Sequence, residues 1–136
     1  MGYLWHGHYL ALFEEARTDW LRARGMSYRA LEDTGTLLVV VEVGVRYLRP
    51  GAYEDELVIR CWPVEAGGAT LRLEYEALRA HERLATGFTL LAATDRRGRP
   101  CRLPDSLRAL VAPASEAAGT GATPAAVQGH RRESAR

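Results

Sequence analysis

Two histidines, His6 and His8, stand on either side of a glycine near the start of the chain, directly before a stretch with helical periodicity. Histidine is the side chain whose ordinary pKa lies nearest neutral pH, so it can act as a general acid or base. The first backbone N–H groups of a helix lack intrahelical partners and carry partial positive charge. A polarisable carbonyl or an anion could be held there. The alternative interpretation is a pair of solvated loop histidines.

One long amphipathic helix is predicted for the stretch that follows these histidines. Apolar side chains recur at helical spacing, among them Tyr9, Phe13 and Trp20, while charged residues occupy the flanks. We expect the helix to end at Gly25, because glycine adopts the left-handed conformation of a helix C-cap. Its aromatic stripe should dominate the energetics of the core.

The chain after this helix predicts a second, short helix and four strands joined by tight turns. A run of strands after a helix favours an antiparallel α+β layer over alternating βαβ units. Pro63 implies that its strand is an edge strand or contains a bulge. The expected elements are a helix at Tyr28–Asp33 capped by Ser27, strands at 36–49, 57–64, 70–80 and 83–94, and a helix at 106–111 capped by Asp105.

Length and composition predict one globular domain with a short tail. The chain has 136 residues, which is enough for one modest core. We expect the domain to cover residues 1–112 and the small, polar segment 113–136 to be disordered. The net charge of +1 gives no reason to expect a nucleic-acid partner.

Cysteine usage and hydropathy predict a cytoplasmic protein with no metal site and no membrane partner. Cys61 and Cys101 lie in separate segments without CxxC spacing, and no cluster of His, Cys and carboxylates has metal-ligand spacing. No apolar run approaches the roughly 18 residues that span a bilayer, and no signal-peptide pattern is present.

Several short motifs carry a resemblance to a known family. The chain reads MG-x-x-W-H-x-x-YL-x-x-FEEAR at its start, V-x-V-x-YLRP-x-x-YEDEL in its middle, and G-F-T followed by D-x-x-GRP-x-x-LP near its end. In this order and spacing the motifs resemble the hotdog-fold acyl-CoA thioesterases, and most of all the 4-hydroxybenzoyl-CoA thioesterase and YbgC-like group. The resemblance runs from Met1 to about Leu107.

This resemblance implies a fold, an activity and an assembly. The fold would be α+β, an antiparallel sheet wrapped around one long central helix, assembled as a homodimer or homotetramer with active sites between subunits. The activity would be hydrolysis of an acyl-CoA thioester to a carboxylic acid and CoA, without a metal or redox cofactor. Two alternatives remain open, a non-catalytic hotdog subunit that binds acyl-CoA and a hotdog enoyl-CoA hydratase.

The resemblance also assigns roles to residues at the chain start. It implies catalytic roles for His6 and for the backbone N–H near Gly7, and substrate contacts for Gly2, Trp5 and Tyr9. Tyr9 would line the acyl pocket from the first helical turn, although the aromatic rings near the site could instead complete the core. The acyl group itself is not predicted.

The family carries an aspartate just before the position of Gly2, which would fall upstream of Met1. Either the natural chain extends upstream and supplies this aspartate with a first strand, or the chain lacks the usual carboxylate. Glu14 and Glu15 are the nearest local carboxylates. For both we expect a solvated or ion-paired role, with Glu14 paired to Arg17 at i+3 spacing.

Arginines at strand ends and turns are the candidates for contacts with the phosphates of CoA. Guanidinium groups match phosphate geometry well. The candidates are Arg46, Arg49, Arg99 and Arg102, and of these Arg49 is our predicted substrate-binding residue. An exposed surface role is the alternative for each.

Overall fold

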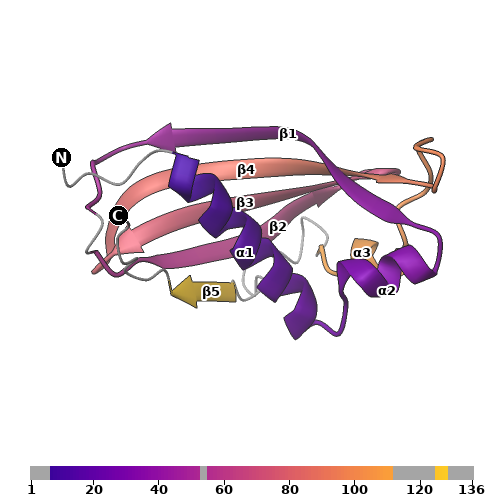
Figure 1. Cartoon of the computed structure of the whole chain (residues 1–136), viewed down its shortest axis with the longest axis horizontal. Helices are drawn as coiled ribbons and strands as arrows, with labels where there is room; N and C mark the ends of the chain where they lie inside the picture. The colour runs from indigo at the N-terminus through magenta and orange to yellow at the C-terminus, as the bar shows by residue number, and fades with distance from the viewer. Residues whose placement is uncertain (1–6, 53–54, 112–124, 129–136) are drawn as a thin grey trace, which may run out of the picture.

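An antiparallel five-stranded sheet curves around one long helix, as Figure 1 shows. The computed structural model describes residues 7–52, 55–111 and 125–128, the last of these as backbone alone. The elements in chain order are α1 (Gly7–Ala23), α2 (Tyr28–Asp33), β1 (Leu37–Tyr47), β2 (Val58–Ala66), β3 (Thr70–Arg79), β4 (Glu82–Thr94), α3 (Asp105–Arg108) and β5 (Ala125–Gln128).

The strands follow the order β1-β4-β3-β2-β5 across the sheet, and every pair is antiparallel. β2, β3 and β4 form consecutive hairpins, so the helix-then-strands pattern of the sequence produces the predicted α+β layer. Helix α1 crosses the strands diagonally on one face of the sheet (Figure 1). No helix in the described segments is long and apolar enough to cross a bilayer.

Helix α1 forms because its apolar positions recur on one side, and this side is buried against the sheet. Tyr9, Phe13 and Trp20 are all buried, as the periodicity predicted. Gly25 lies two residues after the helix with a φ of 78°, the left-handed conformation expected of a C-terminal stop.

Helix α1 packs closely against the sheet at Phe13. Its ring stacks on Tyr75 of β3, with ring centroids 4.7 Å apart and planes 12° from parallel. Gly87 of β4 lies beneath the same ring, and a Cβ atom at that position would be 2.5 Å from Phe13 Cε2. The glycine therefore allows α1 to pack directly against the backbone of β4.

Strand β3 alternates as predicted, because its core-facing residues are buried and the intervening charged ones are only half-buried. The predicted irregularity at Pro63 is also present, since the pairing of β2 with β3 shifts register between Pro63 and Glu65. A second bulge, which the sequence did not indicate, lies in β1 at Val41.

The two short helices differ in how well they match expectation. Helix α2 has the predicted bounds, and the Ser27 hydroxyl accepts a hydrogen bond from the Ala30 N–H at 3.0 Å. Helix α3 is a single turn preceded by Pro104, so the prediction that Asp105 caps a longer helix is wrong. Asp105 instead lies 3.4 Å from the Arg102 guanidinium.

Strand β5 lies within the segment for which the sequence predicted disorder. Its backbone pairs with β2 from Val58↔Gln128 to Cys61↔Ala125. The absence of apolar periodicity had indicated no buried face, but an open strand edge can be paired by backbone hydrogen bonds whatever the side chains. Residues 112–124 and 129–136 lie outside the described residues.

Candidate active site

The start of α1 is the place where the sequence predicted chemistry, and the helix begins there at Gly7. Its first turn contains no acidic side chain, so the partial positive charge of the leading N–H groups is not neutralised locally. Of the predicted site residues, Gly2, Trp5 and His6 lie outside the described residues. Gly7 and Tyr9 are described.

Tyr9 has a buried hydroxyl for which the described residues offer no hydrogen-bond partner. Its ring lies beside that of Tyr47 at the end of β1, with centroids 5.8 Å apart. Burial raises the pKa of Tyr9, and the negative charge of Asp55 adds to this rise. The hydroxyl is therefore held in its neutral form, with an O–H to donate.

Charged residues at the same end of the sheet form a connected network. Arg79 at the end of β3 contacts Asp55 at 2.9 Å and Glu82 at 2.8 Å, and Arg49 contacts Glu82 at 3.1 Å. The Asp55 carboxylate also accepts a hydrogen bond from the Ala52 N–H at 2.7 Å. Hydrogen bonding by Arg79 lowers the pKa of Glu82. The network fastens the loop before β2 to the β3–β4 hairpin.

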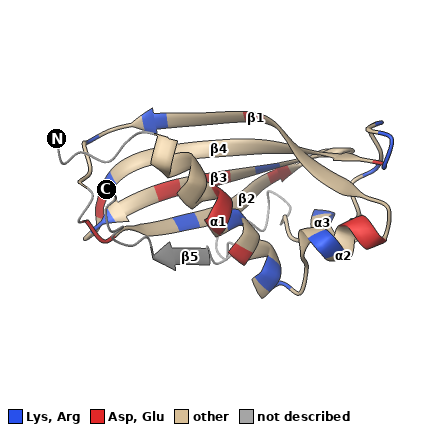
Figure 2. Ribbon diagram, viewed as in Figure 1, with Lys and Arg blue, Asp and Glu red and all other residues tan. Residues whose placement is uncertain are grey.

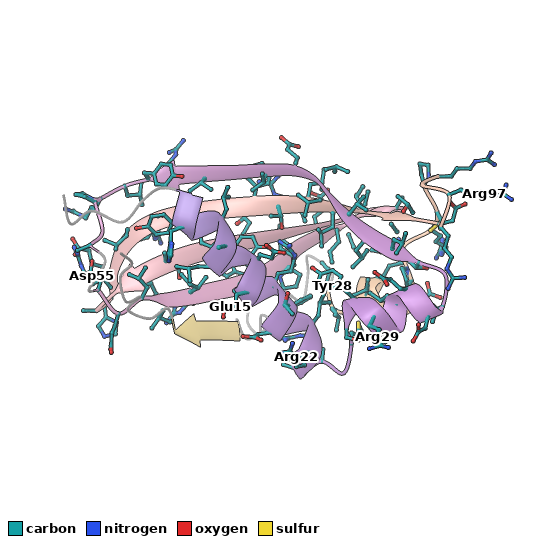
Figure 3. All side chains as sticks on the ribbon, in the orientation of Figure 1. Glu15, Arg22, Tyr28, Arg29, Asp55 and Arg97 are labelled. Carbon is teal, nitrogen blue, oxygen red and sulfur yellow. The ribbon has the colours of Figure 1, made fainter. Side chains whose placement is uncertain are left out.

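The sequence did not predict this network, although Asp55, one of its members, lies in a motif described above. Asp55 is part of the YEDEL motif, but its partner Arg79 is far away in the chain. Figure 3 shows Asp55 at the end of the molecule where β1 finishes and α1 begins. The available signal was a carboxylate within the YEDEL motif, and periodicity alone does not identify its partner.

The four candidate arginines for phosphate binding fall at two opposite ends of the protomer. Arg46 and Arg49 lie at the end of β1, on the same side as the start of α1. Arg99 and Arg102 follow the end of β4 at the other end of the sheet (Figure 1). A single protomer therefore does not bring all four together.

Glu14 and Glu15 are exposed on the outer side of α1, and Figure 3 shows Glu15 on the helix surface. The predicted ion pair of Glu14 with Arg17 is wrong. Arg17 lies one helical turn after Phe13, within the apolar stripe, and only 6% of its surface is exposed. Its Nε donates to the hydroxyl of Tyr28 at 2.6 Å instead.

The guanidinium of Arg17 belongs to a polar network inside the core. It also donates to the hydroxyl of Tyr75 at 3.2 Å, and Tyr75 shares a hydrogen bond of 2.7 Å with Thr89. Burial raises the pKa of the neighbouring Cys61 thiol to about 12. These groups join α1, α2 and the sheet, and they lie away from the start of α1.

A hollow of about 570 Å³ lies on the face of the sheet opposite α1. Trp62 and Phe88 form part of its lining, and the Arg72 guanidinium lies 4.0 Å from the Phe88 ring centroid. Several charged side chains in its lining form ion pairs, for example Arg83 with Glu76 at 3.2 Å. This hollow is separated from the start of α1 by the sheet.

The described residues contain no candidate metal site, because they include no group of three or more His, Cys, Asp or Glu side chains that could hold an ion. Both cysteines are free thiols, with Cys61 buried and Cys101 partly exposed. The start of α1 therefore offers backbone N–H groups, a buried phenol and a nearby ion network for chemistry.

Known proteins place this geometry in context. YbgC of Haemophilus influenzae, named an acyl-CoA thioesterase, is 28% identical over 95 residues, which cover 69% of this chain and 70% of YbgC. The DHNA-CoA thioesterase of Staphylococcus aureus superposes with a TM-score of 0.71 and 28% identity, covering 76% of this chain and 70% of that one.

Other relatives match over a shorter part of their length. YneP of Bacillus subtilis is 31% identical over 68 residues, and this chain spans 49% of it. A relative from Aquifex aeolicus is matched over 42% of its length. The architecture, one long helix within an antiparallel sheet, is the hotdog fold of the structurally similar thioesterases.

The match to a family model decides the relationship. The model is described as the thioesterase superfamily, and it matches residues 1–86, which include the start of α1, the apolar stripe and the first three strands. The chain therefore belongs to the thioesterase superfamily.

Proposed function

We propose that this protein is an acyl-CoA thioesterase that hydrolyses a thioester to a carboxylic acid and CoA. The observation that carries the proposal is the buried Tyr9 hydroxyl, which lacks a hydrogen-bond partner among the described residues and lies at the N-terminal end of α1. An unsatisfied buried hydroxyl costs about 1–3 kcal/mol, so a ligand that accepts its hydrogen bond is strongly favoured. Membership of the thioesterase superfamily and the name of YbgC support the choice of ligand.

In this mechanism the thioester carbonyl oxygen lies against the first N–H groups of α1, starting near Gly7. Water attacks the carbonyl carbon, and the developing oxyanion is stabilised by these preorganised donors. His6 accepts the proton of the attacking water. The tetrahedral intermediate then breaks its C–S bond, and protonated His6 returns its proton to the departing CoA thiolate.

Tyr9 and Arg49 would contact the substrate on either side of the reacting carbon. The Tyr9 ring would line the acyl pocket, for which the family resemblance also implies Gly2 and Trp5, and its hydroxyl would donate to an oxygen of the substrate. Arg49, which is 62% exposed in its side chain, reaches out towards the phosphates of CoA. No metal or redox cofactor takes part in these steps.

The same proposal includes a homodimer formed through β1. Val40 and Val43 pair with the buried residues Leu91 and Thr89, so they point to the α1 side of the sheet, yet 47% and 44% of their surface is exposed. The outer edge of β1 also has backbone groups that no described strand pairs. A second copy added at this edge would satisfy both features.

Cytoplasmic localisation completes the proposal. Both cysteines are free thiols, which suits a reducing compartment. Acyl-CoA thioesters are also intracellular metabolites, so the enzyme and its substrate would share one compartment.

The decisive test of the activity is thiol release from a panel of aryl and alkyl acyl-CoA thioesters by the full chain. We expect turnover with at least one member and a loss of activity in His6→Ala. Tyr9→Phe should lower kcat/KM by about tenfold or more, because a hydrogen bond to the reacting group is lost. The same change should not lower stability, since it removes a hydroxyl without a described partner.

Three results would contradict the proposal. One is the absence of thiol release from the whole panel, with saturable CoA binding left intact; that result would favour a non-catalytic binding subunit. Another is Tyr9→Phe with unchanged kcat/KM. The third is a Val43→Glu variant that remains a dimer by light scattering, because this change should give a monomer. Glu14→Gln on the exposed side of α1 is the control and should leave the dimer intact.

A further inference from the structure

The ion network of Asp55, Arg79, Glu82 and Arg49 lies at the end of the molecule where α1 begins, and Figure 2 shows positive and negative charge together at this end. Exposed ion pairs contribute little to stability. Two members of the network are accessible, since 62% of the Arg49 side chain and 39% of the Glu82 side chain are exposed. Stability alone therefore does not account for four connected charges at this place.

The hairpin turn that carries the network has a strained backbone. Arg79 and Glu82 are the paired residues that close the β3–β4 hairpin, and Ala80 and His81 between them have φ values of 50° and 75°. Residues other than glycine adopt this left-handed conformation at an energetic cost, and Asn-Gly is a preferred pair at such a turn. Backbone strain that is retained in a fold often marks a functional site. The turn brings the Arg79 guanidinium to 2.8 Å from the Glu82 carboxylate.

Arg79 connects both ends of the loop between β1 and β2 to this hairpin. Near the end of the loop, the Oδ2 atom of Asp55 accepts hydrogen bonds from the Arg79 guanidinium at 2.9 Å and from the Ala52 N–H at 2.7 Å. Near the beginning of the loop, Arg49 contacts Glu82 at 3.1 Å, and Glu82 is held in turn by Arg79. The positions of both loop ends therefore depend on one guanidinium group.

The network reaches the candidate active site through the end of β1. Tyr47 is the last residue of β1, and the following Leu48 N–H donates to the Leu84 carbonyl of β4 at 2.8 Å. The Tyr47 ring lies beside Tyr9, with ring centroids 5.8 Å apart. Because 48% of Tyr47 is exposed in the single chain, packing in the core does not fix this ring by itself. A shift of the loop would therefore move the surface against which Tyr9 lies.

The charges of the network also act on the Tyr9 hydroxyl. Burial is the main cause of the raised pKa of Tyr9; the Asp55 carboxylate raises this pKa further, the Arg79 guanidinium lowers it, and the neighbouring phenol of Tyr47 raises it. The two charged groups thus lie close enough to influence the hydroxyl electrostatically. The hydroxyl itself has no hydrogen-bond partner among the described residues, so its direction is set by the groups that hold the ring.

We propose that Asp55 and Arg79 are positioning residues, which hold the end of β1 so that Tyr47 keeps the Tyr9 hydroxyl directed at the substrate. This inference rests on the proposed function, in which that hydroxyl donates to an oxygen of the substrate. Neither Asp55 nor Arg79 contacts the substrate in this arrangement, because both act through the two tyrosines. A purely structural role would stabilise the loop without changing what Tyr9 contributes to the reaction.

The first experiment is a double-mutant cycle on kcat/KM. Arg79→Gln and Asp55→Asn should each lower kcat/KM by about fivefold to tenfold, which is no more than the loss in Tyr9→Phe. When Arg79→Gln is added to Tyr9→Phe, kcat/KM should fall by less than about twofold further, because the hydroxyl through which Arg79 acts is already absent. Losses that multiply in the double variant, or no loss in the single network variants, would overturn the proposal.

Two further variants separate positioning from stability. Arg83→Gln is the matched control, because Arg83 lies on the same hairpin but pairs with Glu76 in the hollow on the opposite face, and it should leave kcat/KM unchanged. Ala80→Asn/His81→Gly supplies preferred residues for the turn and should raise Tm. Arg79→Gln should still lower kcat/KM in this stabilised background. Recovery of the wild-type value there would show that the loss was one of stability, and would overturn the proposal.

A measurement without turnover separates this inference from the proposed function. In protein labelled with fluorotyrosine, the fluorine NMR resonance of Tyr9 is the one that disappears in Tyr9→Phe. Asp55→Asn should lower the pKa that this resonance reports and Arg79→Gln should raise it, whereas Arg83→Gln should leave it unchanged. Both shifts in a protein that turns over no thioester would support the network and overturn the thioesterase. Turnover with an unchanged Tyr9 resonance in both network variants would do the opposite.

Discussion

Replacement of Gly87 by alanine probes how closely α1 must approach the sheet. A Cβ atom at this position would lie 2.5 Å from Phe13 Cε2 and 2.9 Å from the backbone oxygen of Gly44 on the neighbouring strand. Neither atom can yield easily, because Phe13 is buried and stacked on Tyr75 and the Gly44 oxygen is part of the sheet backbone. We therefore expect α1 to be displaced.

The size of the effect follows from two opposing contributions. An extra methyl group in a packed core costs about 1–3 kcal/mol. The glycine has no left-handed φ, so alanine loses nothing there and gains about 0.4–1 kcal/mol from a less flexible unfolded chain. The net loss of unfolding free energy should be about 1–2 kcal/mol, which lowers Tm by roughly 4 °C for each kcal/mol.

Chemical denaturation monitored by tryptophan fluorescence measures this loss directly. Gly68→Ala is the matched control, because no heavy atom lies within 4 Å of its Cβ position, and its stability should equal or exceed that of wild type. Phe13→Leu should relieve the crowding, so the double variant Phe13→Leu/Gly87→Ala should be more stable than the sum of the single losses by about 0.5 kcal/mol or more. Unchanged stability in Gly87→Ala, or strict additivity with Phe13→Leu, would refute the reasoning.

Three further changes test other parts of the fold. Trp20→Ala, at a side chain with no exposed surface, should lower the unfolding free energy by about 3–5 kcal/mol in denaturant titration, and Trp20→Phe should lower it less. Ser27→Ala removes the side-chain acceptor for Ala30 and should cost about 1 kcal/mol in the same assay. Because burial raises the pKa of Cys61 to about 12, the folded state binds a proton that the unfolded state releases at lower pH. Stability should therefore fall as the pH rises above the ordinary thiol range, and Cys61→Ala should reduce that fall in denaturant titrations at a series of pH values. An unchanged fall in Cys61→Ala would contradict this assignment.

The sequence predicted those parts of the fold that depend on local periodicity. The stripe of α1 and the alternation of β3 are visible in the chain because, apart from Arg17, the core-facing residues there are apolar or aromatic. Arg17 is the exception, and the prediction that it pairs with Glu14 was wrong. Its position belongs to the stripe, but its charge suggested the surface, and only the distant hydroxyl groups of Tyr28 and Tyr75 explain its burial.

The candidate site was predictable in position and less so in detail. The start of α1 followed from the glycines and the helical pattern, and the structure places Gly7 and Tyr9 there. The partnerless hydroxyl of Tyr9 and the contacts of Asp55 with Arg79 depend on segments that are distant in the chain. Strand β5 was missed for the same reason, because its partner is a strand edge about half the chain length away.

The different treatment of the two outer strands has a consequence for how the protein behaves in concentrated solution. Strand β5 pairs with β2 at Val58–Cys61 and covers one edge of the sheet, while no described strand pairs with the outer edge of β1. With one exposed edge, self-association stops at a dimer. A chain cut before residue 125 would have two exposed edges, and association through both edges can continue without limit, which is how fibrils grow. Strand β5 would therefore limit polymerisation, and higher thioflavin fluorescence of the shortened chain would report its loss.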